Sequence, residues 1–175
     1  WGWYRMGNIS KNDLRKKRFN ETLQYFGCSD TVLGSRLDEF YIKMSPFQTS
    51  LMPHALETLE YLSSKYVMHI ITNGFEEVQN IKIRESGLKP FFKHVISSER
   101  AQARKPDPIV FNLACKLANT SPSASIMIGD DLHTDIEGAC TVLMDNVYYN
   151  PENKVHNRED ITFEIKGLEE LKSIL

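Results

Sequence analysis

The stretch SIMIGDDLHTDIEGA, residues 125–139, decides the fold of this chain. Its apolar first part predicts a buried strand, and its second part predicts a helix over about 134–142. Asp130 and Asp131 follow the strand directly, and Asp135 comes one helical turn later. Carboxylates that crowd a strand end repel one another unless a cation compensates them, and Mg²⁺ prefers such oxygen ligands. The alternative for Asp131 and Asp135 is an interaction with the dipole at a helix N-terminus.

The same alternation of apolar runs with amphipathic segments extends over the rest of the chain after about residue 54. The predicted strands are 67–72, 94–96, 125–129 and 146–149, and the predicted helices are 76–86, 108–118, 134–142 and 167–174. Strands and helices in alternation predict an α/β fold with a parallel sheet and helices on its faces. Ligands of such sheets bind beyond the carboxyl ends of the strands.

The first 45 residues carry helical signals only. Residues 9–26 predict one helix with Ser10 as its N-cap, and residues 30–44 predict a second amphipathic helix. A proline-containing connector then leads to Pro53, which we expect to be the first residue of the next helix. We therefore expect three parts. Residues 1–46 form a helical part, residues 47–53 form a linker, and residues 54–175 form an α/β core.

Composition and charge restrict the function. The 175 residues are 41% hydrophobic and 25% charged, as in a globular protein, and no apolar run is long enough for a membrane span. A net charge of -2 gives no basic field for a nucleic acid polymer, although a small anionic ligand is allowed. Three cysteines without a CxxC spacing indicate neither a disulfide framework nor a zinc site. With no secretory leader in the sequence, we expect a cytoplasmic protein.

Two further motifs follow predicted strands or precede predicted helices. Thr72, Asn73 and Gly74 end the strand 67–72, where a hydroxyl, an amide and loop N–H groups can bind an anion; a simple turn is the alternative. Lys105 precedes a helix, and the proline after it favours an extended backbone at the lysine. A cation that reaches both a phosphoryl group and a carboxylate cluster suits phosphoryl transfer, whereas an isolated lysine is usually a solvated charge.

Taken in order, ITNG (71–74), ARKPDPIVF (103–111) and IMIGDDLHTDIEGA (126–139) resemble the second, third and fourth motifs of the haloacid dehalogenase superfamily. Within it, the chain is most similar to phosphatases with a helical cap, in particular the pyrimidine 5′-nucleotidase branch. Residues 1–27 are similar to the latter half of such a cap, and NVYYNP (146–151) to a later strand of that branch. The resemblance implies a three-layer Rossmann-like core with a helical cap.

The resemblance also implies Mg²⁺-dependent hydrolysis of a small phosphorylated metabolite, such as a nucleoside monophosphate, through an aspartyl-phosphate. The residues that it implies for binding the phosphoryl group are Thr72, Asn73, Gly74 and Lys105. Of these, Lys105 would neutralise charge on that group. Asp130 would ligate Mg²⁺, Asp135 would orient a metal-bound water or Lys105, and Asp131 would lie behind the metal ligands.

The sequence departs from the family at its first motif, DxDxT, which supplies the nucleophile and the general acid. No DxD occurs in the chain. Because translation does not begin at tryptophan, we expect this motif, its strand and the first half of the cap upstream of Trp1, and we expect the 175 residues alone to be inactive. The alternatives are an inactive remnant that binds a phosphorylated ligand, and a phosphomutase. Lys105 with Asp130 argues against a dehalogenase, which needs no Mg²⁺.

Two smaller departures concern the backbone. His54 stands where the family commonly has glycine, and Cys140–Met144 lacks the usual Ala-Gly break after the fourth-motif helix. Aromatic residues of the first part are candidates either for stacking on a base or for the core of the cap, namely Trp1, Trp3, Tyr4, Phe40, Tyr41 and Phe47.

Overall fold

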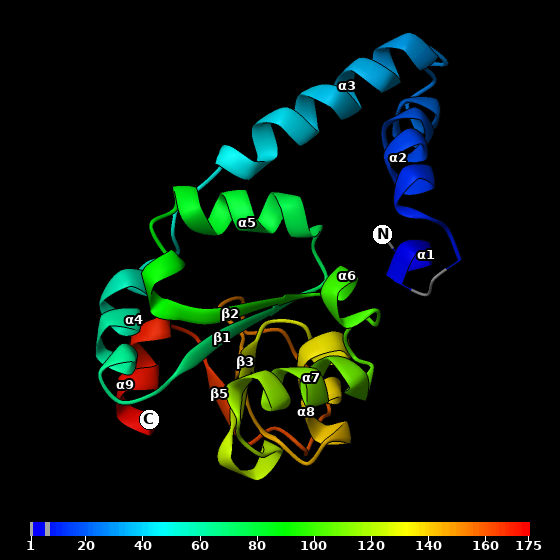
Figure 1. The fold of residues 1–175 in the computed structure, drawn as a ribbon. Helices are drawn as coiled ribbons and strands as arrows, with labels where there is room; N and C mark the ends of the chain where they lie inside the picture. The colour runs from blue at the N-terminus through cyan, green and yellow to red at the C-terminus, as the bar shows by residue number, and fades with distance from the viewer. Residues whose placement is uncertain (1, 6–7) are drawn as a thin grey trace. The chain divides into compact units, whose positions relative to one another are not determined.

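The computed structural model describes residues 2–5 and 8–175, and Figure 1 shows its helices and strands. The chain divides into two compact units, Trp1–Gln48 and Thr49–Leu175. The first unit is helical. Its elements are α1 (Gly2–Arg5), α2 (Lys11–Tyr25), α3 (Thr31–Met44) and the short turn η1 (Ser45–Phe47).

The two long helices of the first unit begin where their caps predict. Ser10 and Asp13 form a capping box, in which the backbone N–H of each residue donates to the side chain of the other at 3.1 Å. The carboxylate of Asp30 accepts the N–H of Leu33 at 2.9 Å and caps α3. Helix α2 ends before Gly27, whose φ of 79° is the left-handed conformation that glycine adopts easily. Both predicted helices are therefore confirmed.

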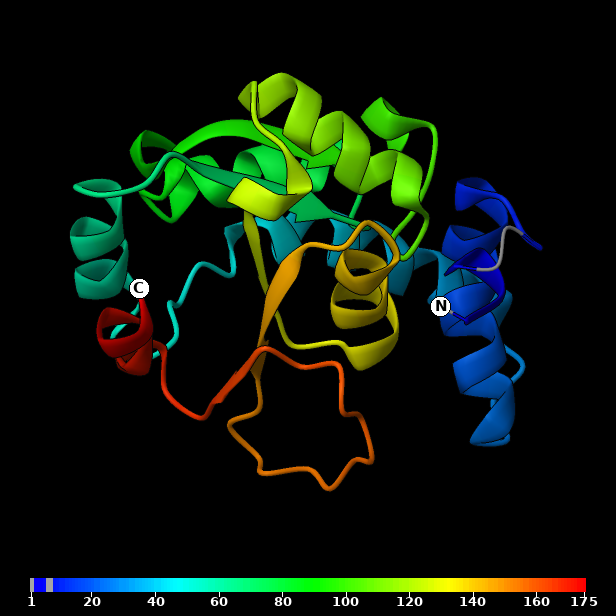
Figure 2. The ribbon, with the colours of Figure 1, turned by 90° about the horizontal axis from the view of Figure 1, so that it is seen from below.

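The second unit contains five strands in two parallel sheets, which Figures 1 and 2 show from two directions. In the first sheet β1 (Met68–Thr72) pairs with β2 (Phe92–Ser97). In the second, β4 (Asp145–Tyr149) pairs with β3 (Ile126–Gly129) on one side and with β5 (Phe163–Ile165) on the other. The predicted α/β fold with parallel strands is confirmed, and β5 is a strand that the sequence did not predict.

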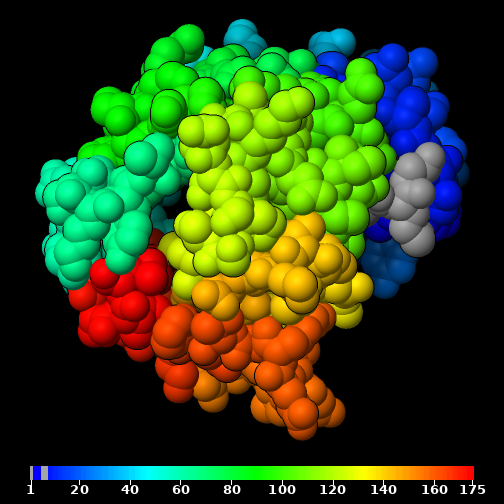
Figure 3. Space-filling model, turned by 60° about the horizontal axis from the view of Figure 1, so that its bottom comes forward, coloured from blue at the N-terminus to red at the C-terminus, as the bar shows by residue number. Residues whose placement is uncertain are grey.

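Helices and short turns connect the strands of the second unit. They are α4 (Ala55–Ser63), α5 (Glu76–Glu85), η2 (Lys89–Phe91), α6 (Ser98–Ala101), α7 (Pro108–Ala118), η3 (Pro122–Ala124), η4 (Leu132–Ile136), α8 (Glu137–Thr141), η5 (Leu168–Glu170) and α9 (Leu171–Ile174). Among residues 2–5 and 8–175, every helix is too short or too polar to cross a lipid bilayer. Helix α9 packs beside α4, as Figure 3 shows, and the hydroxyl of Tyr61 donates to the carbonyl of Lys172 at 3.0 Å.

Three predicted helices differ from the structure. The helix after the connector begins at Ala55 and not at Pro53, because His54 has a left-handed φ of 62° that is incompatible with a helix. The predicted helix 134–142 is a π-helical turn, η4, followed by α8. The predicted helix 167–174 is likewise a 3₁₀ turn followed by the short helix α9.

Two hydrophobic clusters form the core of the second unit. The first contains Ile96, Val110, Phe111 and Ala139, and the second contains Leu62, Val147, Ile165 and Leu171. Strands β1 and β3 contribute to both clusters. Ile71 and Met127 pack against the first, whereas Met68, Ile126 and Ile128 pack against the second.

Strands β1 and β3 therefore share their packing partners although they belong to separate sheets. Every residue of both strands is only half-buried, while the middle of β4 is fully buried. Inner strands of parallel sheets are normally covered on both faces and paired on both edges. Strands β1 and β3 thus each have one edge without a partner strand within the described residues.

Candidate active site

The predicted site residues gather where β1 and β3 end. Thr72 is the last residue of β1, and the Thr72 hydroxyl accepts the N–H of Gly74 at 3.0 Å. Gly129 is the last residue of β3, and Asp130 follows it. A chain of contacts through Lys105 joins the two strand ends, which places them at the same edge of the fold.

Lys105 is fixed through its backbone by Asn73. The N–H of Lys105 donates to Asn73 Oδ1 at 2.9 Å, and Asn73 Nδ2 donates to the carbonyl of Lys105 at 3.0 Å. The loop then enters α7, where the Asp107 carboxylate caps the helix at the N–H of Ile109, 2.9 Å away. The oxygen and the nitrogen of the Asn73 side-chain amide thus both bond to the backbone of Lys105. The sequence did not predict that Asn73 would position Lys105.

The ammonium group of Lys105 points to Asp135. Its Nζ lies 2.5 Å from Asp135 Oδ1, and the two side chains are only 11% and 5% exposed. The other carboxylate oxygen of Asp135 accepts the N–H of Asp131 at 3.2 Å. Of the two roles that the sequence allowed for Asp135, the structure places it in contact with Lys105.

We define residues 130–135 as the acidic turn. Hydrogen bonds to Asp131 and close packing against Gly129 fix the backbone of this turn. Asp131 caps η4, because its Oδ1 accepts the N–H groups of His133 and Thr134 at 3.0 Å each. Only glycine fits at position 129, since a Cβ there would lie 2.4 Å from the Cβ and Oδ2 atoms of Asp135. Asp131 therefore serves as a helix cap, in line with its alternative reading from the sequence.

Asp130 is the residue available for a metal. Its side chain is exposed and accepts no hydrogen bond from the residues that the structure describes. Nowhere in residues 2–5 and 8–175 do three Asp, Glu, His or Cys side chains come together as a preformed metal site. A Mg²⁺ ion keeps several waters and uses one or two carboxylates plus a phosphate oxygen. The residues present therefore fit an Mg²⁺ ion held directly by Asp130, with Asp135 behind it.

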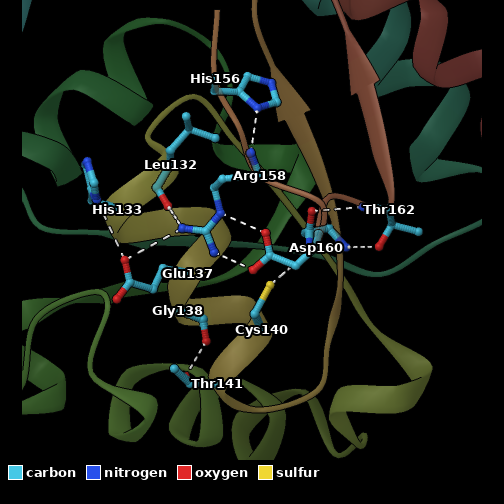
Figure 4. Close-up of polar contacts among 11 residues, drawn as sticks. Leu132, His133, Glu137, Gly138, Cys140, Thr141, His156, Arg158, Asp160 and Thr162 are labelled. Atoms are coloured by element: carbon cyan, nitrogen blue, oxygen red, sulfur yellow. Dashed lines mark hydrogen bonds and ion pairs between the residues drawn. The ribbon is translucent and has the colours of Figure 1, made fainter.

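A polar cluster beside the acidic turn was not predicted. Figure 4 shows Arg158, from the loop that joins β4 to β5, between Asp160 and the start of η4. Arg158 donates to Asp160 through Nε at 2.8 Å and Nη2 at 2.5 Å, and this guanidinium lowers the pKa of Asp160 to about 2. Burial raises the pKa of the nearby Cys140 thiol, with a smaller contribution from Asp160 in the same direction. No sequence pattern links Arg158 with η4, because the contact joins an irregular loop to a turn.

The aromatic candidates of the first unit occupy different environments. Tyr4 is buried, with 3% of its surface exposed, whereas Trp3, Phe40 and Phe47 are more than half exposed. Tyr41 packs with its ring against Phe19 and against the guanidinium of Arg18, 4.2 Å from the ring centroid. Trp1 lies outside the described residues.

Comparisons with known proteins agree with this geometry. A profile for haloacid dehalogenase-like hydrolases matches residues 5–147. The pyrimidine 5′-nucleotidase PynA of Streptococcus pneumoniae is 30% identical over 178 residues, which cover 100% of this chain and 74% of that protein. The HAD-hydrolase YfnB of Bacillus subtilis is 30% identical over 177 residues, again 100% of this chain and 74% of that protein.

Solved structures show the same likeness. The magnesium-bound crystal structure of YfnB superposes with a TM-score of 0.87 at 29% identity, covering 99% of this chain and 76% of that one. A 2-haloacid dehalogenase from Pseudomonas syringae superposes with a TM-score of 0.71 at 28% identity, covering 93% of this chain and 70% of that one.

Proposed function

The chain belongs to the haloacid dehalogenase-like hydrolase family, and we propose that it is part of a Mg²⁺-dependent phosphatase that hydrolyses a small phosphomonoester. The observation that carries the proposal is the buried contact between Lys105 and Asp135, which holds a cation against the acidic turn. That turn begins with Asp130, an exposed residue that directly follows β3. A fixed cation next to a hard-metal ligand at the ends of parallel strands suits the transfer of a phosphoryl group. The similarity to PynA supports a nucleoside monophosphate as substrate.

Lys105 is the residue that we assign to charge stabilisation. Asn73 fixes the lysine backbone and Asp135 fixes the ammonium group, so little reorganisation is needed when a phosphoryl group arrives. A preorganised positive charge in a half-buried site stabilises the developing negative charge more than a mobile lysine in water would. The Thr72 hydroxyl only accepts in its bond with the Gly74 N–H, so its own hydrogen would donate to a phosphoryl oxygen.

Asp130 would hold Mg²⁺, and Asp135 would orient Lys105. When bound, the ion would screen the negative charges of the phosphate and of its attacking group. Asp131 would keep the acidic turn in place by capping η4.

We place the attacking carboxylate outside these 175 residues, on a strand that pairs with both β1 and β3. The chain has no DxD motif, and β1 and β3 each have a free edge while packing on the same two clusters. A parallel strand between them would end beside Thr72, Lys105 and Asp130, where an aspartate could attack the phosphorus of a bound phosphomonoester. The P–O bond to the alcohol would break as the aspartyl-phosphate forms, the alcohol would leave with a proton from the second acid of a DxDxT motif, and water would then release the phosphate. We therefore propose that the 175 residues alone do not turn over substrate.

Phosphate release by two lengths of the protein tests this proposal. The 175-residue chain and a longer version that includes the upstream residues are assayed with a panel of nucleoside monophosphates and sugar phosphates, with Mg²⁺ or with a chelator. We expect release only from the longer protein with Mg²⁺. Replacing Lys105 by methionine should lower kcat/KM by about 10²-fold or more, whereas Lys116→Met, an exposed lysine on α7, should leave it within about twofold.

The alternatives give different results in the same assay. An inactive remnant of the fold would bind phosphate or a nucleotide in calorimetry without releasing phosphate from any substrate. A phosphomutase would move the phosphoryl group between hydroxyls of one substrate with little free phosphate. Either result in the longer protein would refute the phosphatase proposal.

A further inference from the structure

The loop of residues 150–162 is anchored at the carboxyl end of β4 by a buried asparagine. Asn150 is 2% exposed, and its Nδ2 donates to Glu164 at 2.7 Å and to the carbonyl of Lys154 at 3.0 Å. Its Oδ1 accepts the N–H of Lys154 at 2.8 Å. A buried amide with all these bonds made fixes the start of the loop.

The second half of the loop is anchored by Arg158, whose contacts Figure 4 shows. Two of its nitrogens hold Asp160 within the loop, and the third, Nη1, donates to the carbonyl of Leu132 at 3.2 Å. The same Nη1 lies 3.7 Å from a carboxylate oxygen of Glu137. The Arg158 side chain is 23% exposed. Its guanidinium therefore connects the loop to both ends of η4.

Leu132 is a sensitive position in the acidic turn. It begins η4, and its carbonyl also accepts the N–H of Glu137, one of the bonds between residues five apart that make this turn π-helical. Single π-helical turns are rare and need support from their surroundings. The backbone of this turn determines where Asp135 lies relative to Lys105, and where Asp130 lies relative to the strand ends.

We propose that Arg158 is a positioning residue that fixes the acidic turn for metal binding by holding the Leu132 carbonyl and the Glu137 carboxylate. The inference rests on the proposed function, because it assigns Asp130 to Mg²⁺. Arg158 acts through the backbone of η4 and contacts neither the metal ligand nor Lys105 in the structure. Removing a hydrogen-bond partner of a metal ligand changes metal affinity by about 10- to 100-fold. Because Arg158 acts one step further out, through the backbone of η4, we expect its removal to fall at the lower end of this range.

Three variants of the full-length protein test the role of Arg158. Arg158→Ala removes all the side-chain contacts and keeps the bond from the backbone N–H to His156. Arg158→Lys keeps one cation but cannot bridge Asp160 and Leu132 together. Arg18→Ala is the matched control, because Arg18 forms a similar part-buried pair with Asp38 at 2.5 Å in the first unit. The readouts are amide hydrogen exchange over residues 131–137 and calorimetric Mg²⁺ affinity without substrate.

We expect Arg158→Ala to speed exchange over this turn and to weaken Mg²⁺ binding about 10-fold, with partial recovery in Arg158→Lys and no change in Arg18→Ala. At saturating Mg²⁺ the KM for the phosphomonoester should change little. Equal exchange and equal Mg²⁺ affinity in Arg158→Ala and the unmodified protein would overturn the inference, even if the melting temperature fell. Failure of the proposed function would instead appear as no phosphate release by the unmodified protein.

Discussion

Replacing Lys105 by methionine should destabilise the second unit strongly, because it leaves the buried carboxylate of Asp135 without its cation. The two side chains are 11% and 5% exposed, and the remaining bond to Asp135 is the N–H of Asp131 at 3.2 Å. Removing one partner of a buried ion pair lowers the free energy of unfolding by about 3–5 kcal/mol, since the other charge stays desolvated. We expect a loss in this range for Lys105→Met.

A double-mutant cycle separates the ion pair from other effects of the substitution. Asp135→Asn removes the opposite charge. In that background, Lys105→Met should lower the free energy of unfolding much less than it does in the unmodified protein, because no buried charge is left without a partner. We expect a coupling energy of about 2 kcal/mol or more. The same cycle on Arg84 and Glu85, which are 67% and 39% exposed, is the control and should give about 0.5 kcal/mol or less.

Equilibrium urea unfolding measures these energies. Both tryptophans of the chain precede residue 48, so tryptophan fluorescence does not follow the unfolding of the second unit. Far-ultraviolet circular dichroism and tyrosine signals from β4 are needed for the second unit. A coupling energy for Lys105 and Asp135 as small as that of the exposed control pair would refute the argument that this contact is a buried, preorganised ion pair.

Three other substitutions have expected outcomes. Leu143 is 87% exposed and has a left-handed φ of 57°, which glycine adopts more easily than leucine or alanine. Leu143→Gly should therefore raise the melting temperature by about 2–4 °C, whereas Leu143→Ala should not. Equal melting temperatures of the two variants would contradict this prediction. Arg158 lowers the pKa of Asp160 from 3.8 to about 2, so the stability that Asp160 contributes is present above pH 3.8 and is lost as the pH falls toward 2. Because the Asp160 side chain is 47% exposed, screening by solvent limits this contribution to about 1 kcal/mol. Asp160→Asn should therefore reduce the acid-induced loss of unfolding free energy by about 1 kcal/mol. An unchanged dependence of stability on pH in Asp160→Asn would contradict this prediction. Burial, assisted by the charge of His94, lowers the pKa of His69. Both ring nitrogens of His69 are buried and have no hydrogen-bond partner among the described residues. Below pH 6.5 the unfolded chain therefore binds more protons than the folded chain, and the free energy of unfolding falls as the pH drops. His69→Leu should raise the free energy of unfolding by about 1 kcal/mol and remove this pH dependence. Thermal unfolding between pH 7 and pH 5 measures both effects. A slope that persists in His69→Leu would assign the titration to another group.

Local sequence patterns predicted the elements that position the site. The Asp107 cap and the proline after it place the start of α7 at residue 108, and the apolar runs place the ends of β1 and β3. Since parallel strands end at one edge, Thr72 and Asp130 could be assigned to that edge from sequence. The motif that resembles the third family motif also placed Lys105 near the carboxylates.

Contacts between distant irregular segments could not be predicted in this way. Arg158 reaches Leu132 from a loop whose sequence has no periodic pattern. The strand β5 has only three residues, which is too few for a period-2 pattern to be recognised. The amide of Asn73 could equally have bound an anion, and only the position of the Lys105 backbone decides its hydrogen bonds. Although residues 140–144 lack the usual Ala-Gly break, α8 ends at Thr141, and Leu143 adopts a left-handed conformation just beyond it.

The free edges of β1 and β3 also bear on the cooperativity of unfolding. Within the 175 residues, the sheet of β1 and β2 and the sheet of β3, β4 and β5 share apolar clusters but no backbone ladder. For this length of the chain we therefore expect each sheet to open as a separate foldon. Between the two sheets, the polar connection runs from Asn73 through Lys105 to Asp135. A bound phosphate group that contacts both strand ends would add to this connection, so ligand binding should convert two subglobal openings into one cooperative transition.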